Sequence, residues 1–428
     1  MEGPDFVSAL IVANLAFVLW LLSTALLIWG ERRVVAKMQT RVGPNRLGPM
    51  GIVQTLADGI KLFFKEDLTP RIADRAVFIA APVISATTAL VMFAVIPFGG
   101  TVELFGREVT LQVWDPEIGL LWVFAMSSIG VYGIVLAGWA SGSKYPLLGG
   151  VRSSAQMVSY ELGMALAFAA VFVWNGTLQV SEIVEAQSGT LAELGPITIP
   201  AWNVLPQVFA FAIFFLTAVA ETQRPPFDLP EGEGEIVGGF HTEYSGAKFA
   251  MFYLGEFMNM FTFSAVMVTL FFGGPGGPLF GPDWLQAILP TLYFMAKTAG
   301  FLFIFIWLRG TLPRFRYDRL MDLGWKVLLP FGLVWVMLTG VIVVGQDELQ
   351  ALGMGQLLTL FGVVGVVALV LLILPSLRRE QAEEEPAVPA SQRVQRVEAR
   401  ELVGATPSRR PAEPPDDVGG DDPDDRER

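Results

Sequence analysis

The sequence contains no cysteine and only one histidine, His241. Iron-sulfur clusters need several thiolates and many haems need a pair of histidines, so this chain alone cannot build either centre. Disulfide bonds are excluded as well, and the redox compartment therefore cannot be inferred from cysteine usage. We predict that the chain binds no cofactor and no metal, and that any electron carriers belong to partner chains.

Charge is also scarce, because only 16% of the residues are charged whereas 53% are hydrophobic. This composition is typical of polytopic membrane proteins. The apolar runs are continuous rather than alternating, and about 20 residues of helix cross a bilayer. We therefore predict an all-α polytopic membrane protein. Its nine candidate transmembrane segments lie near residues 6–29, 76–98, 118–140, 157–175, 205–221, 249–273, 286–308, 326–345 and 351–375.

Basic residues in the short connections predict the orientation of the chain. The connection after the first span and the one after residue 308 are rich in Lys and Arg, whereas the alternate connections carry mainly Asp and Glu. The positive-inside rule then places the N-terminus outside and the C-terminus in the cytoplasm. Residues 1–375 form the predicted transmembrane domain, and residues 376–428 are a charged, proline-rich segment predicted to be a disordered cytoplasmic tail.

Residues 52–66 show a different pattern, with Ile52, Leu56 and Ile60 on one helical face and Asp58 and Lys61 on the other. This pattern predicts an amphipathic helix that lies along the cytoplasmic membrane surface. Its polar face is either a solvated side or the wall of a chamber in which Asp58 and Lys61 pair one turn apart. Both interpretations remain open from the sequence.

Residues 221–256 gather seven carboxylates beside apolar and glycine-rich sequence. An ionised carboxylate near hydrocarbon is costly, so such groups usually serve the movement of protons or cations. Pro225 and Pro226 should end the preceding helix and hold the carboxylates in a defined loop. An ordinary solvated acidic loop is the alternative.

Lys297, in the middle of a predicted span, could exchange protons or pair with a glutamate to fix helix packing.

Four sequence segments occur in a characteristic order. They read GERRVVAKMQTRVGPNRLGPMGIVQTLADGIKLFFKE, SGSKYPLLGGVRSSAQMVSYE, AETQRPPFDLPEGEGEIVGGFHTEYSG and RFRYDRLMDLGWK. Through these segments the chain closely resembles the H-subunit family of bacterial proton-translocating NADH:quinone oxidoreductase, respiratory complex I. The mitochondrial counterpart is NADH-ubiquinone oxidoreductase chain 1. The resemblance covers residues 1 to about 345.

The resemblance implies a membrane-arm subunit that encloses the membrane part of the quinone tunnel and couples quinone reduction to proton translocation. The tunnel residues that it implies are Glu31, Arg32, Arg41, Asp58, Lys61, Phe227 and Arg309. The implied proton path comprises Glu161, Glu221, Glu231, Glu235 and Glu256, supported by Asp228 and Arg224.

The resemblance also implies partners and a location. Flavin mononucleotide and iron-sulfur clusters would lie in partner subunits, and quinone would be the substrate, either ubiquinone or menaquinone. The partners would be the other complex I subunits: those of the hydrophilic arm, the adjacent small membrane subunits and the antiporter-like subunits. The implied location is the bacterial cell membrane.

Two other functions remain open at this point. One is the anchor subunit of a related membrane-bound hydrogenase or another dehydrogenase that shares the same membrane architecture. The other is an independent cation or proton transporter that uses the same carboxylates. Whether the chain transports ions alone would distinguish the transporter from the other two.

Overall fold

The computed structural model describes residues 6–104, 107–194, 197–229 and 236–345. Two predicted members of the proton path, Glu231 and Glu235, lie outside these residues. So do the ninth predicted span at 351–375 and the predicted tail at 376–428.

Within the described residues the fold is a helical bundle, and seven helices are long and apolar enough to cross a membrane. All eight predicted spans that fall in this part of the chain are helices, although α7 is shorter than the others. The principal helices are α1 (Phe6–Met38), α3 (Arg75–Met92), α4 (Gly119–Ala140), α5 (Lys144–Asn175), α7 (Val208–Glu221), α9 (Gly246–Phe271), α10 (Asp283–Thr311), α11 (Tyr317–Asp322) and α12 (Leu329–Val344). A π-helix at Leu323–Leu328 joins α11 to α12.

Two helices begin or end well beyond their predicted apolar segments. Helix α1 continues to Met38, so Glu31 and Arg32 lie within the helix rather than after its end. Helix α5 begins at Lys144, well before residue 157. The apolar segments stop at charged residues, but Glu, Lys and Arg are good helix formers and do not end a helix.

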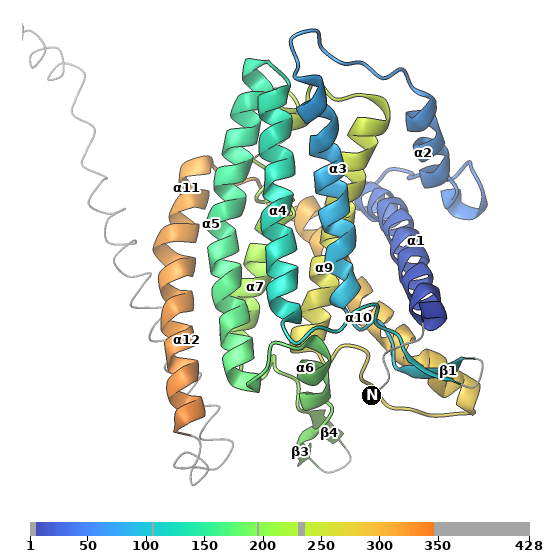
Figure 1. Cartoon of the computed structure of the whole chain (residues 1–428), viewed down its shortest axis with the longest axis vertical. Helices are drawn as coiled ribbons and strands as arrows, with labels where there is room; N and C mark the ends of the chain where they lie inside the picture. Colours follow the sequence, from blue (N-terminus) through green and yellow to red (C-terminus); the bar gives the residue numbers. More distant parts are fainter. Residues whose placement is uncertain (1–5, 105–106, 195–196, 230–235, 346–428) are drawn as a thin grey trace, which may run out of the picture. The chain divides into compact units, whose positions relative to one another are not determined.

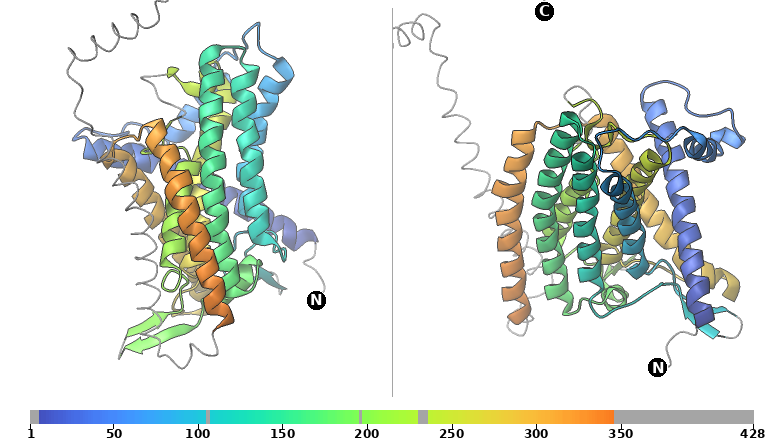
Figure 2. Two further views of the ribbon diagram at one scale, coloured as in Figure 1. Left: turned by 90° about the vertical axis from the view of Figure 1, so that its left-hand side faces the viewer. Right: turned by 45° about the horizontal axis from the view of Figure 1, so that its top comes forward.

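Helix α9 is the centre of the bundle. In the most apolar 18-residue stretch of α9, 83% of the residues are buried. The corresponding stretches of the other long helices are only 28% to 56% buried. Helix α1 lies at one edge of the bundle and α12 at the opposite edge (Figures 1 and 2). Between them, α5 packs against α4, α7 and α12, and α3 packs against α4 and α9.

The contact between α4 and α5 depends on glycine. A Cβ atom added at Gly138 would lie 2.5 Å from the carbonyl oxygen of Pro146, which is closer than a side-chain carbon can approach. Small residues at such positions allow membrane helices to pack backbone against backbone. The carboxylates that α5 and α7 carry therefore lie close to the polar residues of α4.

Helix α2 (Gln54–Phe64) lies at the end of the bundle beside the last turns of α1 (Figure 1). It contains no buried residue, and Leu56, Phe63 and Phe64 are 64%, 76% and 89% exposed. The prediction of an amphipathic helix is confirmed. Because nothing in the described chain covers its apolar face, that face is free to contact lipid or another subunit.

The connection between α1 and α2 is held in one shape by side chains of α1. Arg33 donates hydrogen bonds to the carbonyl oxygens of Pro44, at 3.4 Å, and Met50, at 2.7 Å. The indole of Trp29 donates to the same Met50 oxygen at 3.0 Å. These bonds, together with a short 3-10 turn at Pro49–Gly51, fix where α2 begins.

Two small β-hairpins lie at the opposite end of the bundle from α2 (Figure 1). Strand β1 (Thr101–Leu104) pairs with β2 (Arg107–Thr110), and β3 (Thr190–Leu194) pairs with β4 (Ile197–Pro200), both antiparallel. Sequence analysis did not predict these hairpins. The short helix α6 (Val180–Ala186) and the 3-10 turns at Phe93–Val95 and Gly239–His241 complete the described elements.

Candidate functional site

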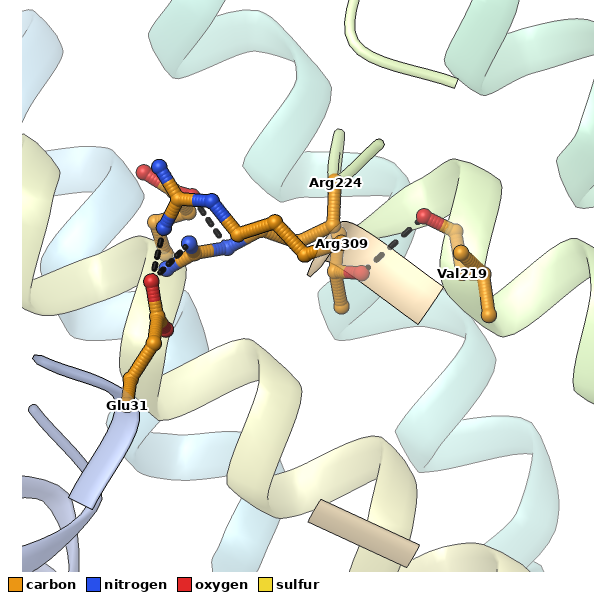
Figure 3. Close-up of polar contacts among 6 residues, drawn as sticks. Glu31, Val219, Arg224 and Arg309 are labelled. Carbon is orange, nitrogen blue, oxygen red and sulfur yellow. Dashed lines mark hydrogen bonds and ion pairs between the residues drawn. The ribbon is translucent and has the colours of Figure 1, made fainter. Parts of the chain in front are cut away.

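Four charged side chains from separate parts of the sequence meet near the α2 end of the bundle. They are Glu31 in α1, Arg224 after α7, Glu256 in α9 and Arg309 in α10, and we call them the four-charge cluster. Arg224 Nη1 donates to Glu31 Oε1 at 3.1 Å, and Arg224 Nε lies 2.6 Å from Glu256 Oε1. Arg309 also forms an ion pair with Glu31 (Figure 3).

The cluster is neutral overall and its centre is buried. Glu31 is 6% exposed and Arg224 only 4%. Removing one partner of such a buried ion pair typically costs about 3 to 5 kcal/mol, because the other charge is left without compensation. The Arg224 guanidinium also lies over the ring of Phe257, 4.3 Å from its centroid, which adds a cation–π contact on one face.

The segment that carries Arg224 is fixed by hydrogen bonds from a neighbouring helix. Helix α7 ends at Glu221, in agreement with the prediction that the following prolines stop it. Gln156 on α5 donates to the carbonyl oxygens of Ala220, at 2.8 Å, and Phe227, at 2.7 Å. One buried amide therefore holds both sides of the turn from which Arg224 reaches the cluster.

Two predicted members of the proton path approach a pair of consecutive serines on α4. Ser127 Oγ donates to Glu221 Oε1 at 2.9 Å, and Ser128 Oγ donates to Glu161 Oε1. Both carboxylates are buried, and they are close enough to interact electrostatically. The structure therefore brings together carboxylates from α5 and α7 that lie 60 residues apart in the sequence.

A small cavity of about 40 Å³ has both Glu221 and Glu256 in its wall. His241, Asn259 and Ser85 line it as well. Glu256 therefore belongs to the four-charge cluster and to the cavity. The contacts can be followed in one series from Glu161 through the two serines to Glu221, then across the cavity to Glu256, and from there through Arg224 to Glu31.

Four of the predicted tunnel residues line one open groove of about 690 Å³ beside α2. They are Arg32, Arg41, Asp58 and Lys61. Arg32 forms an ion pair with Asp58, and Lys61 Nζ lies 3.7 Å from Asp58 Oδ1, which confirms the predicted pairing one turn apart.

Asp58 is charged at neutral pH. Partial burial alone would raise the pKa of its carboxyl. Hydrogen bonds from Arg32 and Gln54, with the positive charges of Arg32 and Lys61, outweigh burial and lower the pKa below its usual value. The polar face of α2 is thus a wall of fixed charges.

The remaining predicted tunnel residue, Phe227, is buried among aromatic rings. Its ring centroid lies 5.5 Å from that of Tyr160 and 5.6 Å from that of Phe315. Asp228 follows it and is partly exposed. Neither side chain is among those lining the groove or the cavity.

Lys297 contacts carbonyl oxygens in place of the glutamate considered from the sequence. Its ammonium donates to Phe272 at 2.8 Å, Gly274 at 3.0 Å and Gly276 at 2.7 Å. These three acceptors match the three protons of an ammonium group. In the described part of the chain, Lys297 therefore fastens α10 to the end of α9.

Sequence analysis missed Ser127, Ser128 and Gln156. Their signal is weak but present, because the serines are small polar residues inside an apolar run and Gln156 immediately precedes a predicted span. Polar residues at such positions commonly bond between membrane helices. Among the described residues, no group of three His, Asp or Glu side chains is arranged to hold a metal ion.

Comparisons with known proteins agree with one another. The model of a family described as NADH dehydrogenase matches residues 11–340. A protein from Frankia casuarinae, named as the H subunit of NADH-quinone oxidoreductase, is 52% identical over 334 residues, which cover 77% of this chain and 71% of the relative. A protein of the same name from Frankia alni is 52% identical over 341 residues, 79% of this chain and 72% of the relative.

Proposed function

The chain belongs to the NADH dehydrogenase family, the H-subunit family of complex I, and we propose that it joins a quinone tunnel to a proton path. It is a multi-pass membrane subunit of an oxidoreductase, and the other complex I subunits are its partners. In the proposed reaction, electrons from NADH pass through flavin and iron-sulfur clusters in partner subunits to quinone. Quinone takes up two electrons and two protons and becomes quinol. The proposed location is the bacterial cell membrane.

The observation that carries this proposal is the position of Arg224 between two carboxylates. On one side it holds Glu31, which belongs with the proposed tunnel residues, and on the other side it holds Glu256, which belongs with the proposed proton path. A change of charge near Glu31 during quinone reduction would alter how strongly Arg224 holds Glu256. The affinity of Glu256 for a proton would change in consequence.

The contacts beyond Glu256 support a route for protons. Glu256 shares the cavity with Glu221, and Glu221 and Glu161 accept hydrogen bonds from the consecutive serines Ser127 and Ser128 of α4. Because these carboxylates interact, their protons belong to the coupled group rather than to single residues. Glu231 and Glu235 enter this proposal from the sequence resemblance, with Asp228 in a supporting role.

The tunnel wall in this proposal begins at the groove beside α2. Arg32, Arg41, Asp58 and Lys61 supply fixed charges there, and Arg32 lies next along α1 to Glu31, which pairs with Arg309 in the four-charge cluster. Phe227 would shape the tunnel through its aromatic contacts rather than through a charge.

Purification of the intact assembly tests the proposal. The chain is tagged at its native locus, extracted in mild detergent, and analysed for co-purifying proteins and inhibitor-sensitive NADH:quinone reductase activity. We expect flavin and iron-sulfur subunits to co-purify, and NADH oxidation by the assembly in sealed vesicles to move protons. Recovery of the chain alone, or with a nickel-iron hydrogenase, would overturn the proposal.

A further inference from the structure

A narrow groove runs between α1 and α3 in the hairpin half of the bundle. Helix α1 packs against α9 and α10, whereas α3 packs against α4 and α9. Both sides of the groove therefore rest on α9. The indole of Trp20 on α1 donates to the hydroxyl of Thr262 at 3.4 Å, and the ring of Phe93, just after α3, lies 5.6 Å from that of Phe261. These contacts hold α1 and α3 in place with a space between them.

The groove has a volume of about 230 Å³, and its side chains are all hydrophobic. Ala13 and Ala16 form part of the α1 wall, and Leu90 and Ala94 form part of the facing wall. Both walls belong to helices that are long and apolar enough to cross a membrane, so the groove lies at the depth of the lipid hydrocarbon. Water finds no polar partners there, and an empty groove would forfeit dispersion contacts along its lining. An apolar occupant is therefore favoured.

The dimensions of the groove limit what this occupant can be. The seven-residue step from Ala13 to Trp20 covers about 10 Å of helix, so the volume corresponds to a mean cross-section of about 23 Å². An α-helix at least about 10 Å in diameter has a cross-section of roughly 80 Å² and does not fit. An isoprenoid tail carries methyl branches along its length and needs more width than a straight chain. The groove therefore suits one unbranched hydrocarbon chain.

The hairpin end of the groove changes from apolar to polar. Val113 lines the groove, and the next residue, Trp114, is 46% exposed. The backbone N–H of Trp114 donates to the Ala94 carbonyl at 3.0 Å, and the Gln112 amide donates to the Val95 carbonyl at 2.9 Å. Tryptophan is enriched at the level of the lipid headgroups. The order of these residues matches an amphiphile with its head at the membrane surface and its chain in the groove.

We propose that this groove is a binding site for one acyl chain of a membrane phospholipid, which completes the packing between α1 and α3. This inference is independent of the proposed quinone and proton roles. Phe17 stands at the rim and is 45% exposed, so the chain can enter from the side of the bilayer. Lipid tails are as apolar as leucine, so the site holds its chain by close contact on two sides rather than by the hydrophobic effect.

Photocrosslinking in the intact complex tests the identity of the occupant. A benzophenone amino acid replaces Phe17, and in a separate control it replaces Val18, the next residue, which is 58% exposed. After exhaustive detergent exchange and illumination, mass spectrometry identifies the adducts. We expect a phospholipid adduct at position 17 and none at position 18, because lipid that only surrounds the protein is washed away. No adduct at position 17, an adduct with detergent, quinone or another subunit there, or equal phospholipid labelling at both positions would overturn the proposal.

Filling the groove tests its capacity. Ala13→Phe and Ala94→Phe place a ring in the groove from opposite walls, so we expect each to lower phospholipid crosslinking at position 17 about tenfold. Ala80→Phe is the matched control, because Ala80 is an exposed position on α3 outside the groove. Assembly is followed by NADH oxidation with an artificial hydrophilic acceptor. If either groove variant assembles and keeps native crosslinking, the site is wrong; if neither assembles, the adducts at positions 17 and 18 decide the question alone.

Discussion

At the scale of single residues, Arg224 is the side chain on which most of the site depends. Its planar guanidinium presents donors in several directions, and it uses them on two carboxylates from different helices. Lysine carries the same charge on one compact group and cannot reproduce this geometry. The identity of the residue therefore matters as well as its charge.

We expect Arg224→Lys to leave the complex assembled but to lower quinone reductase activity at least about tenfold, because the link between Glu31 and Glu256 is broken. Arg224→Gln should in addition destabilise the chain by about 3 to 5 kcal/mol, since the buried Glu31 is left with its Arg309 pair alone and Glu256 loses its ion pair with Arg224. The amount of assembled complex and its thermal midpoint measure this difference. Arg316→Lys is the control, because that exposed arginine pairs only loosely with Asp318, at 3.4 Å.

The proposed proton path predicts a selective loss of activity. Glu221→Gln and Glu256→Gln should lower quinone reduction and proton pumping about 100-fold, because the amide cannot transfer a proton. NADH oxidation by an artificial hydrophilic acceptor should survive. If both activities fall together, the variants impair assembly and say nothing for the proton path. Glu185→Gln, an exposed position at the hairpin end, should change neither activity.

His241 predicts a pH dependence of stability. Burial lowers the pKa of the folded imidazole to about 4, from 6.5 for an exposed histidine. The unfolded chain therefore binds the proton first as pH falls. The stabilisation from neutral His241 is complete above about pH 6.5 and is lost progressively towards pH 4, by up to about 3 kcal/mol. Thermal midpoints should show this decline, and His241→Asn should flatten it; an unchanged slope would contradict the assignment.

At the scale of elements, α2 is held by its ends while its apolar face stays open. The segment after α2 is fastened to the start of α9, where Ser245 donates to the Glu66 carbonyl at 3.2 Å. Lys248 Nζ lies 3.0 Å from Asp67 Oδ1 and 2.8 Å from the Thr69 hydroxyl. The position of α2 therefore depends on side chains of other elements rather than on a buried face of its own.

We expect Lys248→Met to speed amide hydrogen exchange in α2 and in residues 65–72 about tenfold, because the ion pair and the hydrogen bond are both lost. Exchange in α4 and α5 should stay unchanged. Lys326→Met, which breaks an exposed pair with Asp322 at 2.6 Å, should leave α2 unaffected. Equal exchange in the two variants would show that Lys248 does not position α2.

The elements also show how far the sequence predicts this structure. Apolar runs and helical periodicity are local signals, and they identified α2 and every described span. The hairpins were not predicted, because each strand has only four or five residues and so gives too short a pattern. The four-charge cluster was not predicted for a different reason. Glu31 pairs with Arg224, which lies 193 residues away in the sequence, and only tertiary packing brings the two together. The resemblance assigned Glu31 to the tunnel residues and Arg224 to the support of the proton path, and the structure shows that the two side chains form an ion pair.

At the scale of the whole molecule, the described chain has two distinct ends. The α2 end carries the groove and the four-charge cluster, and the opposite end carries the hairpins. The basic connections predict that the α2 end is cytoplasmic. The hydrophilic arm of the complex would then dock at the end where the proposed tunnel opens.

The absence of cysteine makes this orientation easy to test. Val42→Cys places a thiol at the α2 end, where residue 42 is 79% exposed, and Ser188→Cys places one at the exposed hairpin end. We expect a membrane-impermeant maleimide to label residue 188 in intact cells, and residue 42 only after permeabilisation and separation of the hydrophilic arm. The reverse pattern would invert the orientation. The cysteine-free parent is the control for background labelling.

The contact of Lys297 with three carbonyl oxygens has a mechanical consequence. It anchors the hairpin end of α9 to α10, whereas Glu256 lies towards the other end of α9. The hairpin end of α9 is therefore fixed relative to α10. Any displacement of Glu256 that involves the backbone of α9 is then a tilt or a bend about Lys297, and sliding along the helix axis is resisted.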